Sequence, residues 1–162
     1  MRSPSVPIEG DSALKLAKAK NQPTVIVGTI GHDAHIVGAS VIKYALEEAG
    51  FKVVFLGAVV PPEEFIRAAI ETAADAILIS SLYGMARIDC ANFGAKCCEA
   101  GLEHVKLYLG GILVTDPEEW QETEKLFKSY GFHRVYPPQT KPEVAIADLK
   151  KDLGVCSIDP LN

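Results

Sequence analysis

The sequence predicts an α/β domain built on one parallel β-sheet with helices on both of its faces. From Pro23 onward, short runs of apolar and β-branched residues alternate with longer amphipathic stretches, which is the pattern of successive β-α units. The short runs are continuously apolar, as expected for strands that are covered on both faces. Glycines follow the longer stretches and prolines stand near their starts, at Gly50, Gly101, Gly131, Pro62, Pro117 and Pro142.

Five strands and five helices can be assigned in this pattern. The strands are predicted at residues 24–30, 52–57, 75–80, 104–109 and 132–136. The helices are predicted at about residues 37–49, 62–73, 88–100, 117–130 and 141–153. Five units in this order predict a flavodoxin-like, doubly wound five-stranded sheet with strand order 2-1-3-4-5 and three α/β/α layers.

One domain accounts for most of the 162 residues, which are enough for a core of its own. We expect residues 1–22 to form a loose N-terminal extension, in which residues 11–18 have the pattern of one short helix. Residues 23–154 are expected to form the folded domain and residues 155–162 a C-terminal tail. No internal repeat indicates a second domain.

The composition bounds the partners and the compartment. A net charge of −5 provides no positive field for nucleic acid or anionic lipid, so neither is an expected partner. The longest apolar stretch, residues 53–60, is far too short to cross a membrane, and a cytoplasmic location is predicted. The cysteines, Cys90, Cys97, Cys98 and Cys156, lack C-x-x-C spacing, which favours reduced packing residues over a zinc site.

The loop after the first predicted strand carries the chemistry that best fits a metal ligand. Doubly wound sheets bind ligands beyond the carboxyl ends of their strands. Here His32, Asp33 and His35 lie in that position. An imidazole can bind a transition metal, and Asp33 is close enough to hold the second ring nitrogen of His35. By itself, an Asp-x-His sequence is more often a hydrogen-bonded turn, and this alternative stays open at this point.

Two further loops add weaker signals at the same edge of the sheet. Ser80 and Ser81 place hydroxyl groups at the end of the third strand, and Gly110-Gly111 lets a bulky group approach the backbone after the fourth. A turn with positive φ is an equal reading of the glycine pair. The chain has neither G-x-G-x-x-G nor G-x-x-x-x-G-K-[ST], so a dinucleotide or nucleoside triphosphate is not indicated.

Taken together, D-x-H-x-x-G, S-x-L and G-G after the first, third and fourth strands resemble the cobalamin-binding domains of mutases and of methionine synthase. Within that group the chain most resembles the small, or sigma, components of glutamate mutase, also called methylaspartate mutase, over residues 24–154. The stretches that carry this resemblance are residues 80–84 (SSLYG), 88–90 (IDC), 99–102 (EAGL), 134–138 (RVYPP) and 146–148 (IAD).

The resemblance implies a role for each matching residue. His35 is the expected axial cobalt ligand, with Asp33 as its hydrogen-bond partner. The implied cofactor-binding residues, several of them around the displaced dimethylbenzimidazole nucleotide tail, are His32, Asp33, Ala34, His35, Ile36, Gly38, Ser80, Ser81, Leu82, Gly110, Gly111, Ile112, Leu113, Val114, Thr115, Asp116, Pro138 and Thr140. Three residues depart from the family pattern: His32, Ile112 and Gln139 stand where relatives tend to have serine, asparagine and glycine.

The resemblance also implies a cofactor and a partner. Adenosylcobalamin is the expected cofactor, and a larger barrel-type epsilon component, assembled with this chain as a heterotetramer, is expected to carry the substrate. No catalytic residue is expected in this chain, which should be inactive alone. Arg87 is the only arginine expected near the cleft, whereas a dicarboxylate substrate calls for several.

Two rival functions use the same fold. A corrinoid carrier for methyl transfer shares the three loop motifs, but such carriers usually have a helical cap before the sheet, and only about 22 residues precede Thr24. A non-catalytic module such as a receiver domain requires a phosphorylatable aspartate after the third strand, where this chain has Ser80-Ser81-Leu82.

Overall fold

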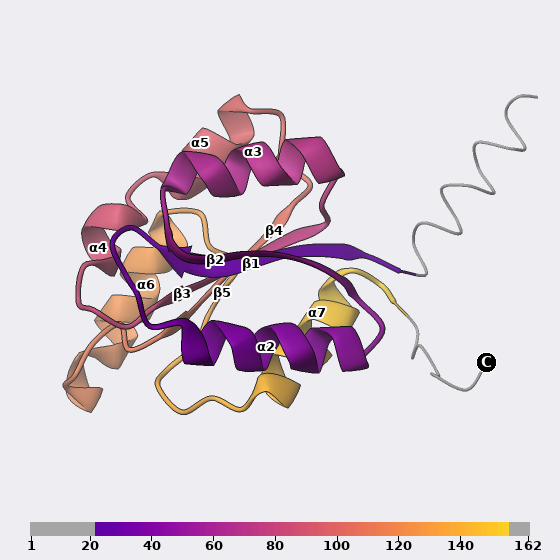
Figure 1. Ribbon diagram of the computed structural model, residues 1–162. Coiled ribbons are helices and arrows are strands. Elements are labelled where there is room, and N and C mark those ends of the chain that lie inside the picture. The colour runs from indigo at the N-terminus through magenta and orange to yellow at the C-terminus, as the bar shows by residue number, and fades with distance from the viewer. Residues whose placement is uncertain (1–21, 156–162) are drawn as a thin grey trace, which may run out of the picture.

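A computed structural model describes residues 22–155 as a three-layer α/β/α structure (Figure 1). Its five strands form one parallel sheet in the order β2-β1-β3-β4-β5, which confirms the predicted fold class and strand order. The predicted short helix at residues 11–18 and residues 156–162 lie outside the described part of the chain. No helix within residues 22–155 has the length and apolar character needed to cross a bilayer.

The elements follow the predicted order, with shifted boundaries. The strands are β1 (Thr24–Ile30), β2 (Lys52–Val60), β3 (Ala76–Ser81), β4 (Lys106–Gly111) and β5 (Arg134–Val135). The helices are α2 (Ile36–Glu48), α3 (Pro62–Thr72), α4 (Ala86–Asp89), α5 (Phe93–Glu99), α6 (Trp120–Ser129) and α7 (Pro142–Asp152), with a 3-10 turn at Pro117–Glu119 before α6.

The predicted helix at residues 88–100 is wrong as a single element, because the chain breaks between α4 and α5. Asn92 adopts a left-handed conformation with φ of 58°, which a continuing helix does not allow. The break brings Gly94 against Gly131, where a Cβ on Gly94 would lie 2.6 Å from the Cα of Gly131. The Gly94 N–H then donates to the Tyr130 carbonyl at 2.7 Å, so tertiary packing replaces helix continuity here.

Further boundary differences lie at strand ends, and the predicted helix at residues 117–130 begins as the 3-10 turn Pro117–Glu119. Residues 104 and 105 belong to a turn, in which the Val105 N–H donates to Leu102, so β4 begins at Lys106. β5 pairs only at Arg134 and Val135, whereas β2 continues to Val60 through irregular pairing with β1. The longer β2 brings Val59 within hydrogen-bond distance of the loop after β1.

Two apolar layers hold the helices to the sheet. α3, α5 and α6 cover one face through a core that contains Phe65, Phe93 and Phe127, all fully buried. α2 and α7 cover the other face, where Leu46 and Leu149 are fully buried. Figure 1 shows α2 and α7 beneath the sheet, where the two helices contact each other, and both helices contribute to the lining of a cavity against the sheet.

Candidate cofactor site

Asp33 is the centre of the loop between β1 and α2. It is fully buried, and its carboxylate accepts three hydrogen bonds. One carboxylate oxygen accepts from the backbone N–H of His35 at 2.9 Å and pairs with His35 Nδ1 at 2.6 Å. The other oxygen accepts from the backbone N–H of Leu82 at 2.6 Å. The carboxylate therefore fixes the His35 ring and joins its loop to the end of β3.

The backbone of Asp33 is held as firmly as its side chain. Its carbonyl accepts from the Thr29 hydroxyl at 2.5 Å and from the Val59 N–H at 2.9 Å. Val59 reaches this position because β2 continues past Gly57, and it adopts a φ of 59°, which is rare for a β-branched residue. The irregular end of β2 thus supports the His35 loop.

His35 presents one ring nitrogen to its surroundings. Its side chain is 61% exposed, although its partner Asp33 is not exposed at all. A carboxylate oxygen can only accept, so Nδ1 carries the proton, and Nε2 keeps a free lone pair. This tautomer and this exposure are what a histidine needs to bind a metal ion that approaches from outside. The geometry favours a ligand over the alternative of a simple polar turn.

A cavity of about 410 Å³ lies beside this loop, between the sheet and the pair α2 and α7. Eight of the sequence-predicted residues line it: Gly38, Ser80, Leu82, Gly110, Gly111, Ile112, Pro138 and Thr140. Nothing lies within 4 Å of the position that a Cβ on Gly38 would take, so the start of α2 leaves open space there. The cavity therefore has room beside the His35 loop for a large group.

Other predicted residues lie elsewhere. Ser81 is buried without a hydrogen-bond partner for its hydroxyl, and Leu113 packs into the core on the opposite face of the sheet. Asp116 accepts from the Glu118 N–H at 2.9 Å and so caps the turn before α6. Val114 and Thr115 do not line the cavity either. His32, Ala34 and Ile36 are exposed around His35.

Several residues that line the cavity were not predicted from the sequence, because their types and positions are those of ordinary core residues. Val27, Leu78 and Tyr108 are paired across β1, β3 and β4, and they point to the same face of the sheet. Ala39 and Ile42 on α2 face them. The strand register could have identified the first three as one row, but the space between that row and α2 has no sequence signal. The other lining residues are Ile79, Leu109, Tyr136, Pro137, Gln139, Lys141 and Ala145.

Two tyrosines of the cavity wall are anchored from behind by α7. The Tyr108 hydroxyl donates to Asp152, and the Tyr136 hydroxyl donates to Asp148 at 2.8 Å. Arg134 binds Asp152 through two hydrogen bonds of 2.8 Å each. Burial, followed by these carboxylate contacts, raises the pKa of both tyrosines. The hydrogen bonds from Arg134 lower the pKa of Asp152 to about 2. The tyrosines therefore stay neutral donors, and the carboxylate stays an acceptor.

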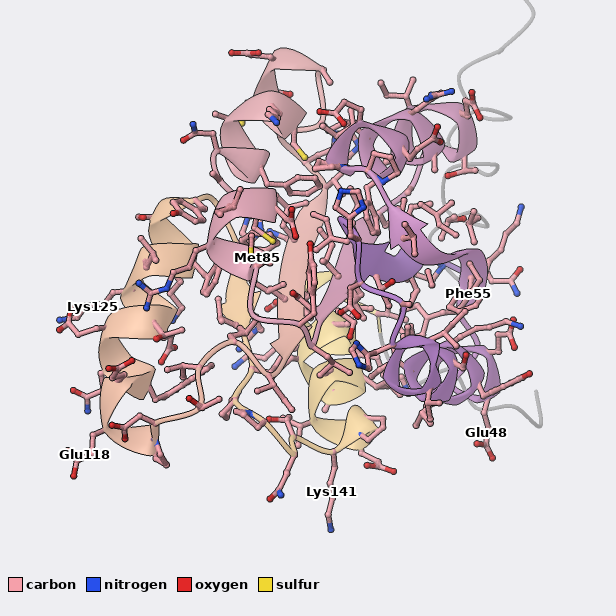
Figure 2. The ribbon with its side chains drawn as sticks, turned by 60° about the vertical axis from the view of Figure 1, so that its left-hand side comes forward. Glu48, Phe55, Met85, Glu118, Lys125 and Lys141 are labelled. Carbon is pink, nitrogen blue, oxygen red and sulfur yellow. The ribbon has the colours of Figure 1, made fainter. Side chains whose placement is uncertain are left out.

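Large apolar side chains are exposed at or after the carboxyl ends of β1, β2, β3 and β4, the edge of the sheet where His35 lies. Val37 is 75% exposed and Ile88 is 69% exposed. Val59, Met85 and Ile112 are also exposed large hydrophobic residues. Figure 2 shows Met85 on the loop that leads into α4, at the same side of the molecule as the carboxyl ends of the strands. Apolar exposure on this scale indicates a surface that a ligand or a protein covers.

The described cysteines have no part in this site. Cys90 and Cys97 are buried in the core, and burial raises the pKa of each thiol to about 12. Cys98 is exposed, which differs from the packing role expected for it, because the adjacent positions 97 and 98 lie on different sides of α5.

Comparison with known proteins gives the class of the domain. A family model described as "B12 binding domain" matches residues 23–134. Among solved structures, a cobalamin-binding protein from Desulfitobacterium hafniense DCB-2 superposes with a TM-score of 0.69 at 19% identity, over 88% of this chain and 64% of that one. The signal receiver domain of NarL from Mycobacterium tuberculosis superposes with a TM-score of 0.61 at 15% identity, over 84% and 99% of the chains. These structural likenesses show the fold alone.

Curated relatives give the family. The glutamate mutase sigma subunit of Clostridium cochlearium is 54% identical over 132 residues, which are 82% of this chain and 96% of the relative. Glutamate mutase sigma subunit 2 of Haloarcula marismortui is 50% identical over 131 residues, 81% of this chain and 88% of the relative. The chain belongs to the glutamate mutase sigma subunit family.

Proposed function

We propose that this chain is the cobalamin-carrying component of adenosylcobalamin-dependent glutamate mutase, which interconverts L-glutamate and 3-methylaspartate. The observation that carries the proposal is His35, exposed at the carboxyl edge of the sheet, held by buried Asp33 and placed beside the cavity. Adenosylcobalamin supplies, when bound, the cobalt–carbon bond whose homolysis starts radical chemistry. This chain binds and orients the cofactor.

When cobalamin is bound, His35 would hold the cobalt ion through Nε2. Asp33 keeps the proton on Nδ1 and holds the ring in one orientation. The exposed apolar residues around His35 suit the flat, mostly apolar corrin ring.

The cavity is the proposed binding place of the displaced nucleotide tail. Gly38 and Gly110 leave the backbone open to the tail, and Ser80 provides a hydroxyl for a ring nitrogen. Tyr108 and Tyr136 offer aromatic surface for a flat base. Of the eighteen cofactor contacts that the resemblance implies, we retain the eight that line the cavity, together with the loop residues Asp33, Ala34, His35 and Ile36.

The substrate site is proposed to lie on a larger epsilon component, with which this chain assembles as a heterotetramer in the cytoplasm. Within the described residues, Lys141 is the only charged residue that lines the cavity, and Arg87 is exposed on α4. A substrate with two carboxylates requires several cationic partners. A carrier of methyl groups or a receiver domain is less well supported, since the curated relatives are mutase subunits.

The decisive experiment compares cobalamin binding by the wild-type chain, His35→Ala and the matched control His32→Ala. The two histidines are close in sequence and both exposed, but only His35 contacts Asp33. We expect the wild type and His32→Ala to shift the visible spectrum of cobalamin to that of a histidine-coordinated form, and His35→Ala to lose this shift. Unchanged spectra for His35→Ala, or no binding by the wild type, would refute the proposal.

A further inference from the structure

Tyr83 and Asp89 contact the His35 loop from outside the cavity. The Tyr83 hydroxyl accepts a hydrogen bond from the backbone N–H of His32 at 3.1 Å and donates its own proton to Asp89. Tyr83 lies in the loop after β3, and Asp89 is the last residue of α4. Neither residue lines the cavity, so neither is explained by tail binding.

The side chains of Tyr83 and Asp89 lie so close to the backbone at position 31 that a side chain there would collide with them. Gly31 adopts a φ of 71°, and a Cβ there would overlap both the Tyr83 hydroxyl and the Asp89 carboxylate. Burial, followed by the hydrogen bond to Asp89, raises the pKa of Tyr83, so the phenol keeps its proton. With that proton directed to Asp89, a lone pair of the hydroxyl faces the His32 N–H.

Two consecutive residues of the loop after β3 therefore hold two consecutive residues of the His35 loop. Leu82 donates to the Asp33 carboxylate at 2.6 Å, and Tyr83 accepts from His32. Asp89 extends this connection to α4, whose outer surface carries the exposed side chain of Ile88.

We propose that Tyr83 and Asp89 are positioning residues that order the Gly31-His32 backbone before the cofactor binds, and so connect α4 with the cobalt ligand. The inference rests on the proposed function, because it takes His35 as that ligand. A loop that is already ordered loses little conformational entropy on binding. Without the pair, the entropy cost of ordering Gly31 and His32 would fall on the binding step and weaken cofactor affinity, although no cofactor contact is removed.

The test uses Tyr83→Phe, which deletes one hydroxyl, with Tyr44→Phe as the matched control on the exposed side of α2. Amide hydrogen exchange at His32 is measured without cofactor, and affinity for hydroxocobalamin is measured by titration of the visible spectrum. We expect faster exchange at His32 and a two- to tenfold loss of affinity, the range that one lost hydrogen bond gives. Histidine coordination in the bound form should persist.

A second pair of variants separates positioning from general stability. Asp89→Asn keeps an acceptor for the Tyr83 hydroxyl and should bind cobalamin with nearly the affinity of the wild type. Asp89→Leu removes the acceptor and should lose affinity as Tyr83→Phe does. If Tyr83→Phe and Asp89→Leu match the wild type in His32 exchange and in affinity, the inference is wrong, although wild-type binding through His35 still supports the proposed function. If the wild type does not bind cobalamin, the proposed function fails. If, in addition, His32 exchanges at the same rate in Tyr83→Phe as in the wild type, the positioning role fails as well.

Discussion

Replacing Asp33 should destabilise the chain even without cofactor, because its carboxylate is buried and serves two backbone donors. Asp33→Ala leaves the N–H groups of Leu82 and His35 without the acceptors that now lie at 2.6 and 2.9 Å. A buried donor without a partner costs about 1–3 kcal/mol, and His35 can recover part of its loss from water because it is exposed. We therefore expect a loss of about 2–4 kcal/mol from a total of roughly 5–15 kcal/mol.

Asp33→Asn keeps the volume but offers one acceptor where two are needed, so a loss of about 1–3 kcal/mol is expected. Urea unfolding of the cofactor-free chain measures both variants, and an unchanged m-value shows that the difference is one of stability. Asp116→Asn is the control, since Asp116 is exposed and accepts one hydrogen bond from Glu118. If both Asp33 variants unfold within about 0.5 kcal/mol of the wild type, the three bonds do not hold the loop.

Three further predictions test the cavity and its surroundings. Gln139→Gly should raise the free energy of unfolding by about 0.5–1 kcal/mol in urea, because Gln139 has a φ of 67°, and Gln139→Ala should give no such gain. Asp152→Asn should lose about 1–2 kcal/mol at neutral pH. The Asp152 pKa is lowered to about 2, so this contribution is complete above about pH 4 and lost as the pH falls toward 2, and acid titrations of both proteins should converge there. Ala145→Phe should fill part of the cavity and weaken cobalamin binding about tenfold or more, while binding of cobinamide, which lacks the nucleotide tail, should not change.

The parts of the fold that could be predicted depend on short-range pattern. β1 begins and ends at the predicted residues, because its apolar run is bounded by Pro23 and by the polar loop. The Asp33–His35 contact was also predictable, since two residues in one loop can meet whatever the distant parts of the chain do. The order of the strands followed from the number and sequence of β-α units.

The parts that could not be predicted depend on contacts between distant residues. Asn92 breaks a helix because Gly94 meets Gly131, and no local feature of residues 88–100 reveals that approach. Of the implied cofactor contacts from Ile112 to Asp116, only Ile112 lines the cavity, because the next residue, Leu113, is buried on the opposite face of the sheet. Such errors arise where a loop leaves a strand and tertiary packing decides which face it follows.

The inner wall of the cavity is mainly apolar, whereas a charged residue, Lys141, lies among its lining residues at the start of α7. This arrangement suggests an orientation for the proposed nucleotide tail. Tyr108 and Tyr136 give their hydroxyl protons to carboxylates of α7 that do not line the cavity, so the inner wall exposes mainly aromatic and aliphatic carbon. Thr140 uses its hydroxyl within its own turn, donating to the Pro137 carbonyl at 2.7 Å. Figure 2 shows the Lys141 side chain extending outward from the start of α7. The proposed nucleotide tail, with a flat apolar base and an anionic linker, would therefore enter with the base first.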